Sequence, residues 1–169
     1  MSGSTRLITY SMAAVDIGSD LPWSWPGGAA SGQRGMVAEI LAEVSMEALQ
    51  GDSLENVLQR IVKCLARHLP IAIASIILLN DERTHFVQEV WAGVELDPRH
   101  ELPRPATRGA SGRCVQTGQP QLADMGVHAD YVPRNVGVKS EYVAPIRHRE
   151  HLHGVLKLES TFKDFFTPA

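Results

Sequence analysis

Two stretches near the beginning of the chain carry apolar residues with a helical period. From Met36 to Leu49 these residues recur every three or four positions, and Glu39, Glu43 and Glu47 fall on the opposite side. The same spacing returns from Leu54 to His68. The pattern therefore predicts two amphipathic helices, each with one apolar side for packing.

Four later segments are typical of strands. Ile71–Leu79 is apolar and rich in β-branched residues, as in a central strand covered on both faces, and Thr84–Ala92 follows after a short polar turn. Ser140–Ile146 and Leu152–Ser160 form a second such pair around a charged turn. We expect two antiparallel hairpins.

The region between the hairpins has little sustained periodicity. Residues 94–108 and 124–138 contain several prolines and turn-forming residues, which predicts loops. A short helix is expected from Arg113 to Thr117, after the glycine-containing run Gly109–Gly112, followed by a strand at Gln121–Ala123. Helices followed by strands around an irregular centre predict an α+β fold with the helices on one face of the sheet.

The chain length suggests one folded unit preceded by a short leader. Residues 1–35 contain glycine and proline without a sustained period, so we expect a flexible leader or linker there and a domain over residues 36–169. Trp23 and Trp25 stay unassigned: a loosely packed tail is favoured, with docking on the folded body or on a partner as the alternative.

Charge and composition exclude several classes of function. A net charge of -3 argues against a broad phosphate-binding surface, so no nucleic-acid partner is expected. The apolar stretches are too short for a bilayer-spanning helix, and the first residues lack the pattern of a signal peptide. Because the chain has only two cysteines, a disulfide scaffold is excluded as well. We expect a cytoplasmic protein with no membrane partner.

The order of these features resembles the GAF domain family, the small-molecule sensor modules of signalling proteins. The stretches that carry the resemblance are Leu54–His68, Ala74–Asp81, Gly109–Pro120, Val138–Ile146 and Gly154–Ser160. The resemblance implies a central antiparallel sheet of five or six strands, with the N-terminal helices on one face and a ligand pocket under the loops 94–108 and 124–138 on the other. The long C-terminal helix usual in the family is expected to be lacking, because the sequence stops at Ala169.

Polar and aromatic side chains at strand ends and loop starts are candidates for contact with a small ligand. The candidates are Trp91, Arg108, Ser111, Asp124, Tyr131, Ser140 and Glu141. The histidines at 148, 151 and 153 are interpreted as a solvated turn rather than a metal site. No catalytic residue, metal ligand or cofactor is assigned.

We therefore expect a non-enzymatic regulatory sensor that binds a small molecule. It would pass the signal to an output module on the same or another chain, or to a second copy in a homodimer formed through the N-terminal helices. Two alternatives stay open. One is a ligand-free GAF dimerisation module, and the other is a free methionine sulfoxide reductase that uses Cys114, as in some relatives of the family.

Overall fold

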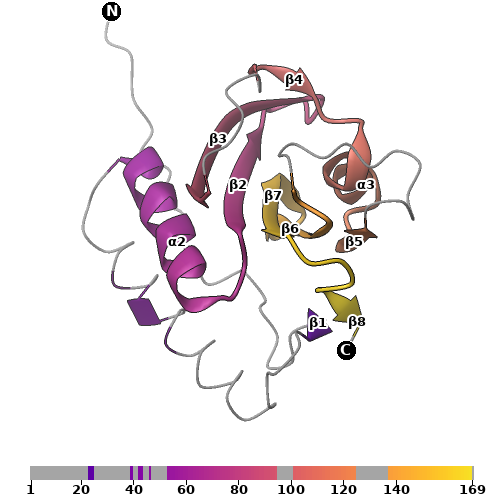
Figure 1. The fold of residues 1–169 in the computed structure, drawn as a ribbon. Coiled ribbons are helices and arrows are strands. Elements are labelled where there is room, and N and C mark those ends of the chain that lie inside the picture. Colours follow the sequence, from indigo (N-terminus) through magenta and orange to yellow (C-terminus); the bar gives the residue numbers. More distant parts are fainter. Residues whose placement is uncertain are drawn as a thin grey trace, which may run out of the picture.

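The fold is built on a six-stranded antiparallel sheet with the strand order β4-β3-β2-β7-β6-β5 (Figure 1). In this computed structural model, the residues described are 23–24, 39, 42–43, 46, 53–94, 101–124 and 137–168. The strands of the sheet are β2 (Ile73–Leu79), β3 (His85–Gly93), β4 (Arg104–Pro105), β5 (Gln121–Asp124), β6 (Ser140–His148) and β7 (His151–Ser160). The predicted α+β class, the antiparallel sheet and both hairpins are confirmed.

Helix α2 (Leu54–His68) covers one face of the sheet (Figure 1). Its first turn is capped by Ser53, whose Oγ accepts a hydrogen bond from the Asn56 backbone N at 3.3 Å. Its apolar stripe is buried against β2, β3, β6 and β7, with these residues in the shared core: Val57, Ile61, Val62, Leu65, Ala74, Ile76, Val90, Tyr142 and Leu158. The predicted helix over 54–68 is confirmed, and burial of its apolar stripe stabilises it.

Helix α3 (Gly109–Thr117) lies on the opposite face, beside β5, β6 and β7 (Figure 1). It begins four residues before the predicted start at Arg113, because Gly112 belongs to its first turn and donates its N–H to Arg108 O at 3.0 Å. A Cβ on Gly112 would lie only 2.4 Å from the carbonyl carbon of Thr107. Glycine at this position therefore allows close packing inside a helix and does not interrupt it.

Three short strands lie where no regular structure is expected from the sequence. Arg104 and Pro105 form β4 at the edge of the sheet, opposite Phe86 and His85. β1 (Trp23–Ser24) pairs with β8 (Thr167–Pro168) in a separate two-stranded ribbon. The backbone of Trp23 is therefore paired with β8, whereas Trp25 lies outside the described residues.

Within the predicted helix over residues 36–49, the four described residues, Glu39, Ala42, Glu43 and Met46, are all helical. No helix in the described part of the chain has the length and apolar character needed to cross a bilayer.

Candidate functional site

A row of directly opposed residues crosses the sheet on the face away from α2. It runs from Trp91 on β3 through Ser75 on β2, Lys157 on β7 and Val143 on β6 to Gln121 on β5. Opposed residues of an antiparallel sheet point to the same face, so these side chains lie on one surface. Helix α3 packs against part of this surface, where its buried Ala110 and Cys114 share a core with four sheet residues: Ile77, Ala123, Val143 and Val155.

Three charged side chains are buried together on this face. Lys157 Nζ lies 2.9 Å from Glu141 Oε2 and 2.9 Å from Glu159 Oε1. The exposed fractions of the three side chains are 3% for Lys157, 5% for Glu141 and 2% for Glu159. Burial of ionised groups costs several kcal/mol per ion before pairing repays part of it. We call this group the Glu–Lys–Glu cluster; it holds two carboxylates and one ammonium.

Two polar atoms in the same region lack a hydrogen-bond partner within the described residues. Ser75 Oγ is one, and the serine is only 1% exposed. Glu159 Oε1 is the other: it lies at ion-pair distance from Lys157 Nζ, but their orientation does not make a hydrogen bond. Unpaired buried polar atoms are costly, so this side of the sheet has hydrogen-bonding capacity that the described residues leave unused.

The β3 end of the face combines an exposed aromatic ring with another ion pair. Trp91 is 44% exposed, although it lies in the same row as the buried Ser75. Glu89, two residues before it and on the same face, accepts a hydrogen bond from Arg104 Nη1 at 3.0 Å. The Arg104 guanidinium carbon also lies 5.3 Å from the centroid of the Phe86 ring. Charged, aromatic and apolar groups therefore adjoin one another on this surface.

Cys114 lies under the same face but is poorly suited to nucleophilic chemistry. Its side chain is fully buried in α3, and burial raises the pKa of its thiol to about 12, only partly opposed by the positive charge of Arg147. The thiolate is the nucleophilic form of cysteine. At neutral pH Cys114 is therefore a protonated, packed thiol.

The structure brings only some of the predicted ligand residues together. Trp91 and Glu141 share the face that carries the Glu–Lys–Glu cluster. Arg108 is exposed at the start of α3, and Ser111 is partly buried within that helix. Tyr131 lies outside the described residues.

Ser140 and Asp124 are not placed with them. They oppose each other on the α2 side of the sheet, where Ser140 Oγ donates to Phe162 O at 2.7 Å and Asp124 Oδ1 accepts from Asp164 N at 3.0 Å. Both side chains therefore attach the segment after β7 to the sheet.

Sequence reasoning missed Lys157, Glu159 and Ser75. In Gly154–Ser160 the charges alternate with apolar residues, a pattern that normally indicates a strand with one solvent-facing side. One feature of the sequence could have indicated the cluster: residues 157 and 159 carry opposite charges on the same face of their strand, and Glu141 lies on the strand paired with it. Glu141 lies on β6, an inner strand between β7 and β5, and is buried.

Comparison with known proteins agrees with this architecture. The GAF domain family model matches residues 53–169. The free methionine-R-sulfoxide reductase of Neisseria meningitidis, solved with its substrate, is similar at 20% identity and a TM-score of 0.66, covering 78% of this chain and 77% of that one. The reduced form of the corresponding Staphylococcus aureus reductase shares 19% identity, with a TM-score of 0.64 and coverage of 78% and 82%. The GAF domain of an Acinetobacter phosphoenolpyruvate-protein phosphotransferase shares 18%, with a TM-score of 0.64 and 80% of each chain covered.

A comparison with curated protein sequences finds no match. The expectation that the chain is not an enzyme is overturned by the structural comparison, because several proteins with this fold are reductases. At these identities the likeness shows the fold, which serves both reductases and GAF domains of signalling proteins. Since the family model covers more than two thirds of the sequence and the sheet has the expected form, the chain belongs to the GAF domain family.

Proposed function

We propose that this GAF domain binds a small molecule bearing a positively charged amino group, on the sheet face that carries the Glu–Lys–Glu cluster. The observation that carries the proposal is the buried excess of carboxylates over ammonium groups around Lys157. A ligand ammonium would supply the second positive charge, and Glu159 Oε1 is available to accept its hydrogen bond.

The energetics of burial support a binding role for the cluster. Replacing a buried ionic group with apolar residues of similar volume is often neutral or stabilising, so such a group is weak evidence of a role in stability alone. The neighbouring sheet positions 77, 143 and 155 are apolar and pack against α3. A core of that kind needs no charges to fold. The charges are better explained by recognition of a polar ligand.

Trp91 adds the second part of the recognition. An exposed indole on the same face, separated from the cluster by strand β2, can contact either the apolar part of a ligand or its ammonium through a cation–π interaction. Small-molecule sites commonly combine such apolar surface with a few polar groups. Free amino acids and other primary amines belong to the ligand class that this arrangement favours.

The regulatory part of the proposal follows from the family. A ligand that binds on this face would alter the sheet strands that also pack against α2, so occupancy could bias how the N-terminal helices meet an output module or a second copy of the chain. We propose residues 36–169 as the sensing unit and a homodimer through the N-terminal helices. Light scattering with and without ligand measures that association.

Binding is tested by thermal shift and isothermal titration against a panel of primary amines, free amino acids and their uncharged analogues. We expect amines to stabilise the protein and their acetylated analogues to have no effect. Glu141→Gln and Glu159→Gln should each weaken binding by about 10- to 100-fold, as for loss of a charged hydrogen bond. Glu150→Gln, in the exposed β6–β7 turn, is the matched control. Equal loss in the control, or no response to any amine, would contradict the proposal.

A second candidate function is reduction of free methionine sulfoxide. The observation that favours it is the likeness to the reductases, two of them solved with substrate, and that substrate class carries an amino group. Reduction of the sulfoxide to the thioether takes two electrons and two protons from two thiols and releases water. Cys64 and Cys114 lie on opposite sides of the sheet, so an external thiol would be needed. Methionine formation in the presence of dithiothreitol, and its loss in Cys114→Ser, would identify this activity.

A further inference from the structure

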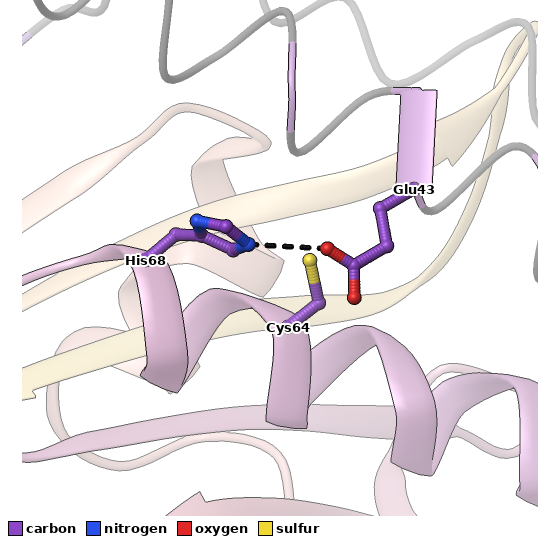
Figure 2. A group of neighbouring side chains, drawn as sticks. All are labelled: Glu43, Cys64 and His68. Carbon is purple, nitrogen blue, oxygen red and sulfur yellow. Dashed lines mark hydrogen bonds and ion pairs between the residues drawn. The ribbon is translucent and has the colours of Figure 1, made fainter.

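Three potential metal ligands meet on the side of the sheet covered by α2. Cys64 and His68 are four residues apart in α2, so they lie on the same side of the helix. Glu43, from a helical segment earlier in the chain, reaches toward both. Figure 2 shows the sulfur, the imidazole and the carboxylate pointing toward one another. From the sequence, Glu43 is assigned to the polar side of its helix, and the contact with α2 shows that this side is not wholly turned to solvent.

The spacing of the donor atoms is close to that of a metal site. His68 Nε2 lies 3.1 Å from Glu43 Oε2, and one donor atom from each of the three side chains lies within 4.8 Å of the others. Tetrahedral zinc, with bonds of about 2.0–2.3 Å, separates its ligand atoms by roughly 3.3–3.8 Å. Small side-chain rotations would therefore bring all three donors into coordination range.

The chemistry of the donor set suits zinc. A thiolate, an imidazole and a carboxylate are the three side-chain types that zinc binds, and the thiolate disfavours calcium or magnesium. Cys64 and Glu43 as anions would balance the charge of a divalent ion, with His68 neutral.

Neighbouring side chains orient the Glu43 carboxylate. Arg67 Nη1 lies 3.0 Å from Glu43 Oε1, which leaves Oε2 directed at His68. Cys64 is 1% exposed, whereas Glu43 and His68 are partly exposed, so an ion has an approach from the solvent side.

We propose that Glu43, Cys64 and His68 bind one zinc ion, with a water molecule as the fourth ligand. Binding replaces the S–H bond of Cys64 with an S–Zn bond and releases that proton to solvent. The ion would join the helical segment of Glu43 to α2, the elements through which association with an output module or second copy is proposed. The site lies on the opposite side of the sheet from the Glu–Lys–Glu cluster and is independent of any ligand there.

The test uses the whole chain with zinc chloride and cobalt chloride. After equilibration and removal of free metal, elemental analysis should find one zinc per chain. Cobalt should give thiolate-to-metal charge-transfer absorption and the intense visible bands of a tetrahedral site. Calorimetry in two buffers of different ionisation enthalpy should detect release of about one proton per zinc.

Variants decide whether these residues form the site. Cys64→Ser should abolish the charge-transfer absorption, and Glu43→Gln and His68→Gln should each weaken zinc binding by at least about tenfold. Glu39→Gln, in the same helical segment, and Cys114→Ser, which removes the other thiol, should retain full uptake. If Cys64→Ser fails to fold, His68→Gln serves instead, because its side chain is partly exposed. No stoichiometric uptake, or uptake unchanged in the Cys64 and His68 variants, would overturn the proposal.

Discussion

Removal of the Lys157 ammonium is the most informative perturbation of the Glu–Lys–Glu cluster. Lys157→Met keeps a long apolar stem of similar volume and deletes only the charge that lies 2.9 Å from each carboxylate. Glu141 and Glu159 are directly opposed across β6 and β7, so the variant leaves two like charges facing each other.

The expected magnitude follows from the burial of all three side chains, each 5% exposed or less. Breaking a buried ion pair by removing one partner costs about 3–5 kcal/mol, because an uncompensated charge remains in a poorly solvated position. Lys157 has two such partners, so the free energy of unfolding should fall by at least about 3 kcal/mol. This is a large part of the total stability of a domain of this size.

Urea denaturation followed by circular dichroism at neutral pH measures this loss. The triple variant Lys157→Met, Glu141→Gln and Glu159→Gln removes the uncompensated charge and should recover most of the stability. Lys63→Met, on the exposed side of α2, is the matched control and should change the free energy of unfolding by no more than about 0.5 kcal/mol. A loss below about 1 kcal/mol for Lys157→Met, or a triple variant no more stable than the single one, would refute this account of the cluster.

Three further outcomes test other parts of the structure. At pH 8 the native Cys114 thiol should react with iodoacetamide about a thousandfold more slowly than after unfolding, measured by mass spectrometry, because its pKa is raised to about 12. Gly112→Ala should cost about 1–3 kcal/mol in urea denaturation, since its Cβ would lie 2.4 Å from the Thr107 carbonyl carbon. The pKa of His153 is lowered by burial and then by nearby His151, so His151→Gln should raise it in an NMR titration. Because folding disfavours the protonated form of His153, this group should reduce stability as pH falls below 6.5.

Local sequence patterns were sufficient to predict most of the secondary structure. The stripe in Leu54–His68 and the paired strand segments gave elements within two residues of the observed bounds, because the period of apolar residues determines which regular structure can bury them. The start of α3 was placed too late. The glycines at 109 and 112 looked like a turn, and only the structure shows that Gly112 is helical and that its closeness to Thr107 leaves no room for a side chain.

The candidate sites depended much more on contacts between distant segments. Glu141 could be singled out from its position at the start of a strand, but nothing in the sequence marked Lys157 and Glu159 as buried, which only the structure shows. The sequence placed Glu43 on the polar side of a predicted helix. Its contact with Cys64 and His68 could not be predicted, because it depends on how that helical segment packs against α2.

The sequence by itself thus determined helix α2 and the two hairpins, because the spacing of apolar residues along each segment decides which regular structure can bury them. Its order of motifs also indicated the family. Tertiary structure alone decided which charged side chains lie in the interior and which donors converge. The electrostatic environment of a side chain depends on the groups that neighbouring segments place around it. The periodicity of its own segment does not show which groups these are.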